Sequence, residues 1–432
     1  MARVLWLSDG GCTTGFGQVT HHIGERLVRD YGHDIHVIAT NHRGDYFPSI
    51  LDPEKPTPLK LYNPTQLDTA DIYGTSRFVE LLGELGETKP GLDCVVALND
   101  PYILLQFLYE NKYDPQKYLL QYRPILYYVP VDGINLPPLW MDVVPKITNT
   151  VAMSKWGQQF YQPSKLVYHG VDPDHFWPVK EKPITLSTGE VLRTKKDAKK
   201  AFGFNPDSFV IGRIDSNSGR KDYPALVKAL APVMAKHKDI EVWLHTQASQ
   251  MQHGVNLGVL WSRYPEVDLS RVKTPDLYSR FIGWPVQDMN GLYNAFDIFV
   301  STSRGEGFGL SLAQSLACGV PIVAQNVSAI PEVVGPGGVL VEPLDRLITV
   351  PAGHDMWLAD IDAFSAAIEH LYEARGVVRK LGEAGREHVR KSFSWDVAAS
   401  KFHSYITGLS NSQAPAVSEN ADEKISELVG GH

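Results

Sequence analysis

The chain has 432 residues, of which 43% are hydrophobic and 21% charged, a balance that excludes a disordered or fibrous protein and favours a globular one. This length exceeds one ordinary hydrophobic core and predicts two domains. The 41 basic and 49 acidic residues give a formal net charge of −8, which provides no field to attract nucleic acid.

The cysteines predict neither a disulfide framework nor a zinc site. Cys12, Cys94 and Cys318 lie far apart and form no CxxC pair, which favours a reducing compartment. The apolar run at residues 4–7 is too short for a signal peptide, and no later stretch reaches the roughly 18 uncharged residues of a membrane span. We therefore expect a cytoplasmic protein without integral membrane association.

The amino-terminal part alternates expected strands and helices. A strand at 4–7 is followed by a glycine-rich loop at 8–17, a helix at 19–30 and a strand at 35–39. Further short, almost wholly apolar strands are expected at 94–98, 125–129 and 150–153. Such alternation predicts a parallel sheet with helices on both faces.

The stretch that follows Asp172 is rich in proline and charge, and it predicts a linker with a small excursion. Its basic run at 193–196 has two interpretations. The lysines could grip an anionic acceptor, or they could form the solvated face of a helix. The composition favours the second interpretation.

A second series of apolar segments predicts another parallel sheet. Its strands are expected at 209–213, 241–244, 279–283, 298–300, 321–324 and 339–341. The fold class is therefore α/β, with two Rossmann-like halves and a cleft between them. Residues 410–432 are rich in Ser, Asn, Ala and Glu, and we expect a disordered tail there.

The stretch at 301–321 carries the most information about chemistry. Small polar residues end an apolar strand, Glu306 follows between glycines, and an apolar-periodic helix then runs to Gly319. Gly307 and Gly309 permit close approach of the backbone to a ligand, and the helix start offers unpaired N–H groups to an anion. This pattern predicts a diphosphate cradle with one carboxylate for sugar hydroxyls. The alternative is an ordinary strand-to-helix turn.

This stretch resembles the signature of the family 4 glycosyltransferases of GT-B fold, in which a glutamate, seven residues, a second glutamate and an Ala-Cys-Gly-x-Pro turn follow one another. Glu306 matches the first glutamate, which the resemblance implies holds hydroxyls of the transferred sugar. Gln314 stands in place of the second, which grips the nucleotide ribose in the family. Glutamine still donates and accepts hydrogen bonds there, but it brings no charge.

The resemblance extends over residues 1 to about 407. Arg213 and Lys221 are similar to the family's pair of cations that clamp the donor diphosphate, although Arg220 could serve in place of Lys221, and an exposed basic turn is the alternative. Two cations suit a leaving group with growing negative charge. Trp284 and Pro285 belong to a loop similar to the one whose backbone reads the nucleobase.

The glycine-rich loop after the first strand fails the dinucleotide fingerprint and lacks the ending of a P-loop. It resembles instead the flexible loop that closes over acceptor and donor phosphate in GT-B enzymes, which assigns Gly15 and Phe16 to the acceptor and Gly17 to the donor. Where the family often has a histidine, this chain has Pro130, and the nearest group able to orient or deprotonate an acceptor hydroxyl is Asp132. An ordinary turn is the alternative for Asp132.

The resemblance implies a retaining, metal-independent transfer from a UDP- or GDP-linked sugar, without a further cofactor. The acceptor can be a protein, a glycan, a lipid carrier or a modified nucleic acid. The catalytic residues it implies are Glu306, Asp132, Arg213 and Lys221, and the donor loop is completed by Gly307, Phe308, Gly309, Leu310 and Gln314. Two other functions stay open: a GT-B enzyme that acts on the donor alone, such as a phosphorylase, hydrolase or epimerase, and an inactive sugar-nucleotide binding protein.

The expected domains are an acceptor-side domain at 1–175 and a donor-binding domain at 176–392. A helix at 393–408, apolar at Trp395, Phe402 and Ile406 among others, is expected to cross back to the first domain.

Overall fold

The computed structural model describes residues 1–42, 44, 46–64, 71, 73–87, 91–109, 124–249, 254–276, 278, 283–349 and 353–410. The chain forms two compact units. The first comprises residues 1–131, 136–168 and the segment from 395 onward, and the second comprises 132–135 and 169–394. The boundary expected after residue 175 thus falls a few residues later than the change of unit, and the short segment 132–135 leaves the first unit to join the second.

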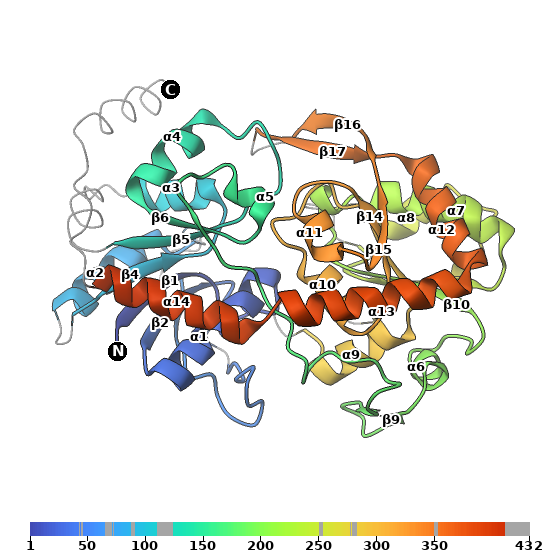
Figure 1. The fold of residues 1–432 in the computed structure, drawn as a ribbon, viewed down its shortest axis with the longest axis horizontal. Helices are drawn as coiled ribbons and strands as arrows, with labels where there is room; N and C mark the ends of the chain where they lie inside the picture. Colours follow the sequence, from blue (N-terminus) through green and yellow to red (C-terminus); the bar gives the residue numbers. More distant parts are fainter. Residues whose placement is uncertain are drawn as a thin grey trace. The chain divides into compact units, whose positions relative to one another are not determined.

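The first unit is an α/β unit with one parallel sheet, and its strands and helices alternate along the chain (Figure 1). The strand order is β3-β2-β1-β4-β5-β6-β7, so the order reverses between β1 and β4. Its elements are β1 (Arg3–Asp9), α1 (Gly15–Tyr31), β2 (Asp34–Thr40), β3 (Lys60–Tyr62), α2 (Thr75–Glu87), β4 (Cys94–Ala97), α3 (Pro101–Tyr109), β5 (Ile125–Val129), α4 (Pro138–Ile147), β6 (Asn149–Ala152), α5 (Lys155–Gln158), β7 (Lys165–Leu166) and α14 (Trp395–Ser410).

The second unit repeats this architecture with the strand order β12-β11-β10-β13-β14-β15. The order reverses between β10 and β13. Its elements are β8 (Ile184–Thr185), β9 (Val191–Leu192), α6 (Lys195–Ala201), β10 (Phe209–Ile214), the 3-10 helix η2 (Gly219–Lys221), α7 (Tyr223–Lys236), β11 (Ile240–His245), α8 (Leu257–Trp261), the 3-10 helix η3 (Leu269–Arg271), β12 (Val272–Lys273), α9 (Val286–Ala295), β13 (Ile298–Ser301), α10 (Leu310–Ala317), β14 (Ile322–Gln325), α11 (Ile330–Val334), β15 (Gly338–Val341), β16 (Pro343–Ile348), β17 (Asp355–Ala359), α12 (Ile361–Glu373) and α13 (Arg375–Ser392).

Burial explains why both sheets are parallel. All four residues of β4, all five of β5 and all four of β13 and β14 are buried, which is the pattern of strands covered on both faces. Parallel pairing is observed in both six- and seven-stranded sheets. The predicted α/β class with two Rossmann-like units is therefore confirmed.

Helix α14 belongs to the first unit, where it packs against α1. The Trp395 and His22 rings stack at 4.6 Å, the Trp6 and Phe402 rings at 5.7 Å, and Ile406 is fully buried. Val397, which belongs to the apolar pattern of this helix, is 55% exposed. Only some of the apolar residues expected to pack from this helix are therefore buried.

The linker excursion contains the β8–β9 hairpin and α6, and the lysines of α6 differ in their exposure. Lys199 is buried and lies 2.7 Å from Asp297, whereas Lys196 pairs with Asp207 at the surface. Burial alone lowers the pKa of Lys199, although the Asp297 carboxylate opposes this effect. Within the run at 193–196 itself, Lys195 pairs with Asp297 at 3.3 Å and Lys196 with Asp207 at 2.6 Å, and both side chains are partly or largely exposed, in agreement with the favoured interpretation of a solvated helix face.

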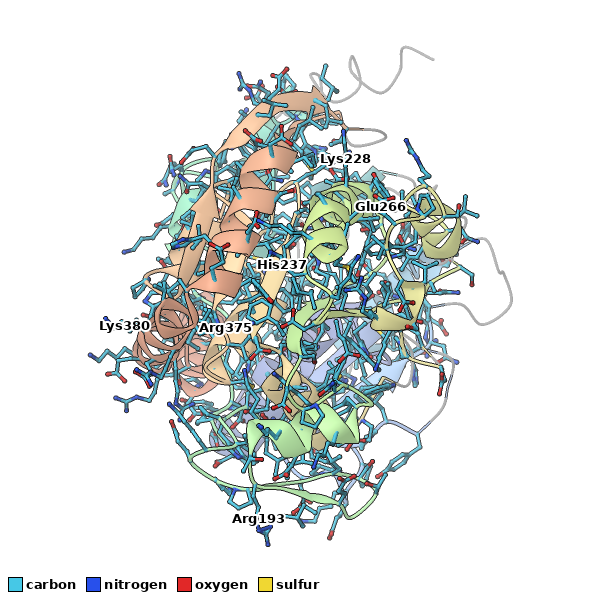
Figure 2. All side chains as sticks on the ribbon, turned by 90° about the vertical axis from the view of Figure 1, so that its right-hand side faces the viewer. Arg193, Lys228, His237, Glu266, Arg375 and Lys380 are labelled. Atoms are coloured by element: carbon cyan, nitrogen blue, oxygen red, sulfur yellow. The ribbon has the colours of Figure 1, made fainter. Side chains whose placement is uncertain are left out.

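Figure 2 shows a face of the second unit that carries charges of both signs, as a solvated surface does. Lys228 of α7, Arg375 and Lys380 of α13 and Glu266 are all exposed. Among the helices that the structure describes, none combines the length and apolar composition needed to cross a bilayer.

Two expectations concern residues outside this description. The tail at 411–432 lies outside the described residues, and so does nearly all of the strand expected at 279–283, of which Gly283 alone is described.

Candidate active site

The candidate site of the second unit lies where the strand order reverses. Arg213 belongs to β10 and Asp215 follows it, while the stretch 302–309 follows β13, the neighbouring strand. Both segments therefore leave the carboxyl edge of the sheet at the same point. In open α/β sheets, ligands bind at the carboxyl ends of the strands on either side of such a reversal.

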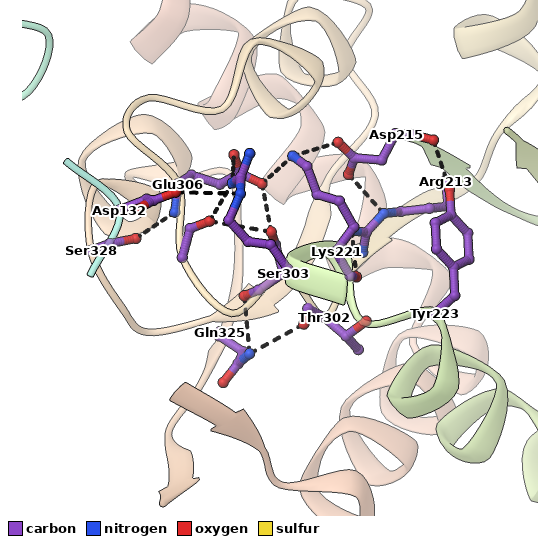
Figure 3. Close-up of polar contacts among 12 residues, drawn as sticks. Asp132, Arg213, Asp215, Lys221, Tyr223, Thr302, Ser303, Glu306, Gln325 and Ser328 are labelled. Carbon is purple, nitrogen blue, oxygen red and sulfur yellow. Dashed lines mark hydrogen bonds and ion pairs between the residues drawn. The ribbon is translucent and has the colours of Figure 1, made fainter. Parts of the chain in front are cut away.

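Glu306 is the centre of a cluster of charged side chains (Figure 3). Its Oε1 accepts hydrogen bonds from Lys221 Nζ at 2.5 Å and from Ser303 Oγ at 2.6 Å, and its Oε2 accepts one from Arg220 Nη1 at 2.8 Å. These bonds occupy three of the roughly four acceptor positions of a carboxylate. The backbone N–H of Glu306 also donates to Ser328 Oγ at 2.8 Å, which fixes the loop.

The charge of Glu306 is stabilised by these partners. Burial by itself would raise the pKa of the Glu306 carboxyl, but the Arg220 and Lys221 charges and the hydrogen bonds from Lys221 and Ser303 bring that pKa well below its ordinary value of 4.5. The pKa of Arg220 is correspondingly raised, because the carboxylates of Glu306 and Asp132 outweigh its desolvation. The site therefore holds an ionised carboxylate between the Arg220 and Lys221 side chains.

The three cations differ in how accessible they are. Arg213 is 1% exposed, and its guanidinium donates to the carbonyl oxygens of Val300 and Lys221 and lies 2.8 Å from Asp215. Arg213 would contact a diphosphate only if these bonds were exchanged. The Arg220 side chain is 32% exposed, so it is the most accessible of the three. Lys221, whose Nζ bridges Glu306 and Asp215, lies between them in exposure.

The backbone after Glu306 has the geometry expected of a ligand-binding turn. Gly309 has φ +98°, in the left-handed region that favours glycine, and it precedes the first residue of α10. Leu310 opens that helix and Gly307 is partly exposed. Phe308 differs from the expectation, because its side chain is buried and its ring lies 4.7 Å from His169 and 5.1 Å from Phe393. Phe308 therefore anchors the loop, and only its backbone is available to a donor.

Gln314 lies partly exposed on α10, and its Oε1 accepts a hydrogen bond from the Tyr293 hydroxyl at 3.1 Å. Tyr293 is fully buried, which raises its pKa well above its ordinary value, so the hydroxyl stays a donor. The hydrogen bond from Tyr293 thus holds the Gln314 side chain in one orientation, at the position where the resemblance predicts a second glutamate.

The candidate nucleobase region contains an aromatic cluster. The Trp284 ring lies 4.7 Å from the His245 ring and 5.9 Å from the Trp243 ring, and Pro285 is exposed at the start of α9. His245 ends β11 and pairs in register with Ile214, so it shares the carboxyl edge with the charged cluster. Burial lowers the pKa of His245 to about 4, which keeps it neutral near pH 7.

Asp132 belongs to the same unit as Glu306. Its Oδ2 lies 3.3 Å from Arg220 Nε, and its side chain is 25% exposed. Arg220 therefore connects Asp132 with Glu306. Pro130, at the position of the family's histidine, precedes this segment and belongs to the first unit.

The glycine motif of the first unit is partly helical, which corrects the expected loop at 8–17 and helix at 19–30. Helix α1 begins at Gly15, because the Thr14 side chain caps it by accepting a hydrogen bond from the Gly17 N–H. Gly15, Phe16 and Gly17 thus form its first turn. A Cβ at Gly17 would lie 2.2 Å from the Cys12 carbonyl oxygen, so only glycine fits there.

Several residues that complete these sites were not predicted from the sequence. In the first unit, buried His21 contacts the Gly10 carbonyl oxygen at 2.6 Å and Glu25 at 2.9 Å. In the second unit, Asp215 holds Lys221, and Ser303 holds Glu306. Only Asp215 had a usable signal, since an acidic residue two positions after a strand-end arginine is a natural partner for it.

Within the described residues, no group of three or more His, Cys, Asp and Glu side chains is arranged to hold a metal ion.

The structural comparisons show the fold. The Anabaena protein HepE in complex with UDP-glucose matches with a TM-score of 0.68 and 16% identity, over 95% of this chain and 100% of HepE. Sucrose-phosphate synthase from Thermosynechococcus elongatus matches with a TM-score of 0.67 and 17% identity, over 95% of this chain and 99% of the synthase. The glycosyltransferase WaaG matches with a TM-score of 0.63. The fold is that of the GT-B glycosyltransferases.

The sequence comparisons concern mainly the second unit. Residues 205–374, which contain the charged cluster of Glu306, match the profile described as Glycosyl transferases group 1. Escherichia coli O-antigen chain mannosyltransferase B is 33% identical over 129 residues, 28% of each chain. D-inositol 3-phosphate glycosyltransferase of Segniliparus rotundus is 27% identical over 54% of this chain and 46% of its own length. These alignments span less than half of either relative.

Proposed function

We propose that this protein transfers a sugar from a nucleoside diphosphate sugar to an acceptor hydroxyl. The observation that carries the proposal is the Glu306 cluster, in which one ionised carboxylate is flanked by Lys221 and Arg220 at the strand reversal. A diphosphate needs cations, and a sugar needs an acceptor of hydroxyl hydrogen bonds. A neighbour solved with UDP-glucose and a relative named as a GDP-mannose-dependent mannosyltransferase support a UDP- or GDP-linked donor.

Each residue of the cluster receives a role in this proposal. Lys221 and Arg220 bind the diphosphate and stabilise the charge that grows on it as the sugar leaves. Arg213 positions Lys221, because its guanidinium donates to the Lys221 carbonyl oxygen and both side chains pair with Asp215. Glu306 binds sugar hydroxyls through its remaining acceptor capacity.

The turn at 307–310 presents backbone N–H groups and the positive end of α10 to the same anion. Since these charges belong to the protein, we propose that the transfer requires no metal ion. From the first unit, we propose that Gly17 contacts the donor and that Gly15 and Phe16 contact the acceptor.

We further propose that the transfer retains the anomeric configuration. In this mechanism the acceptor attacks on the face from which the diphosphate leaves, and a donor phosphate oxygen helps to take the acceptor proton. Asp132 orients the acceptor hydroxyl. No carboxylate nucleophile is required at the sugar, in contrast to a retaining glycosidase.

The test has two steps. A panel of UDP- and GDP-sugars is first screened for an increase in melting temperature, because a ligand of the native state stabilises it. The stabilising donor is then incubated with candidate acceptors in EDTA, and the products are analysed by mass spectrometry and NMR. A new glycoside with the donor's anomeric configuration is expected. Release or interconversion of the sugar without an acceptor, or a bound and unchanged donor, would contradict the proposal.

A further inference from the structure

A β-hairpin of the second unit holds the segment that carries Asp132. Strand β17 and residues 132–135 form an antiparallel bridge: the Ile134 N–H donates to the Asp355 carbonyl oxygen at 3.0 Å, and the Asp355 N–H donates to the Ile134 carbonyl oxygen at 2.9 Å. The Asn135 side-chain amide also donates to the Asp355 carboxylate at 2.7 Å. Three hydrogen bonds therefore fix this short segment to the hairpin.

The segment has no room to shift. A Cβ at Gly133 would lie 2.2 Å from His354 Cδ2 and 2.5 Å from the Asp355 carbonyl oxygen. On the opposite side, a Cβ at Gly305 would lie 1.8 Å from the Asp132 carbonyl oxygen. Two glycines thus permit the hairpin, the 132–135 segment and the Glu306 loop to pack in direct contact.

The hairpin also reaches both ends of the charged cluster. His354, which is 5% exposed, places its Nε2 3.3 Å from Asp132 Oδ1, while Arg220 Nε lies 3.3 Å from Asp132 Oδ2. The two carboxylate oxygens of Asp132 therefore face different partners. Further along β17, the Trp357 N–H donates to the Arg304 carbonyl oxygen, two residues before Glu306.

We propose that the β16–β17 hairpin is a positioning element of the active site, and that His354 is the positioning residue for Asp132. This inference rests on the proposed function, in which Asp132 orients the acceptor hydroxyl. Proline at position 130 has no side-chain group able to do so. The hairpin then sets the distance between the carboxylates of Asp132 and Glu306, because it contacts both the 132–135 segment and the loop that carries Glu306. A displacement of about 1 Å can cost about a hundredfold in turnover.

The experiment compares His354→Ala and His354→Gln with the exposed hairpin variant Arg346→Ala. Hydrogen–deuterium exchange of the peptide containing residues 131–137 reports the position of the segment directly, since the Ile134 N–H is bonded to Asp355. Turnover is followed as nucleoside diphosphate released from UDP-glucose or GDP-mannose, whichever raises the melting temperature, in the presence of the acceptor that the product analysis identifies.

We expect His354→Ala to speed exchange of this peptide about tenfold or more and to lower kcat about tenfold to a hundredfold, with the donor KM changed less than about twofold. His354→Gln should recover most of the kcat, because its amide N–H can occupy the same place and donate to Asp132. Arg346→Ala should match the wild type. Unchanged exchange in His354→Ala, or an equal loss in Arg346→Ala, would overturn the inference.

A second variant keeps the test decisive if His354→Ala does not fold. Gly133→Ala should displace the segment by steric conflict with Asp355 and give the same pattern of faster exchange and lower kcat. If the wild type turns over neither donor, the proposed function fails, and the exchange measurement alone then decides whether the hairpin holds the segment.

Discussion

Replacing Glu306 with glutamine should test the charged cluster most severely. The wild-type carboxylate accepts hydrogen bonds from Lys221, Arg220 and Ser303, and a glutamine of the same shape would turn an NH2 group toward one of these donors. Removing one partner of a buried ion pair costs about 3–5 kcal/mol. Here Lys221 keeps Asp215 at 2.6 Å and Arg220 keeps Asp132 at 3.3 Å, so the loss should be smaller, about 2–3 kcal/mol.

For a unit of this size, such a loss lowers the melting temperature by about 4–12 °C. It should also depend on pH with a definite sign. The pKa of Glu306 is depressed in the folded protein, so its contribution to stability is complete above the ordinary value of 4.5 and is lost as the pH falls toward the depressed value. The difference in melting temperature between the wild type and Glu306→Gln should therefore be constant from pH 7 to about 5.5 and should narrow below about 4.5.

Turnover of the Glu306→Gln variant should fall about a hundredfold to a thousandfold, the effect of removing one preorganised polar partner. The assays are differential scanning fluorimetry across this pH range and product formation with the donor found by screening. Glu383→Gln is the matched control, since Glu383 is 56% exposed and pairs with Lys180 at the surface. Wild-type turnover in Glu306→Gln, or a stability difference that widens in acid, would refute the reasoning.

Three further predictions follow from other contacts. Lys221→Ala should weaken donor binding and turnover together in EDTA, as measured by calorimetry and product formation, and activity that EDTA abolishes and magnesium restores would contradict this. Gln314→Glu should keep or tighten donor binding by up to about tenfold, because the Tyr293 hydroxyl can donate to a carboxylate; a large loss of affinity would show that the site requires glutamine. Phe402→Ala should cost about 3–5 kcal/mol in urea denaturation, because its buried ring packs against Trp6 of β1 and Tyr128 of β5. Val397→Ala should cost less than about 0.5 kcal/mol, because Val397 is 55% exposed, and equal costs would contradict the packing.

Much of the fold could be predicted from the sequence because the strands are buried on both faces. Strand β5 has the bounds expected from its run of apolar residues, and the other expected strands that the structure describes in full differ from expectation by one or two residues at an end. The short strands β3, β7, β8, β9 and β12 were not predicted. The β16–β17 hairpin was not predicted. The exposed positions of β16 include the apolar Leu344 and Ile348 as well as the charged Arg346. The sequence therefore shows no alternation of apolar and polar residues that would indicate a strand.

Part of the candidate site could be predicted, namely the residues that lie next to one another in the sequence. The turn around Glu306 was recognisable because glycines, a carboxylate and a helix start follow one another in sequence. The directions in which individual side chains point could not be predicted from the sequence. Arg213 was expected to face the diphosphate, whereas its side chain is 1% exposed and bonds to backbone carbonyls, and Phe308 anchors the loop.

The contacts of Asp132 depend on tertiary structure. Arg220 is 88 positions away from it in sequence and His354 is 222 positions away, and no local pattern connects them. Such contacts follow from how the chain packs, which periodicity and motif spacing do not encode.

The central claim is that protein cations hold the donor diphosphate, and calorimetric titration with UDP and GDP in EDTA tests it most directly. The wild type should bind one of these nucleotides at least tenfold more tightly than the matching nucleoside, and the Arg220→Ala, Lys221→Ala double variant should lose this preference while its melting temperature without ligand shows that it is folded. Equal binding of nucleotide and nucleoside, or binding of the nucleotide only after magnesium is added, would contradict the account.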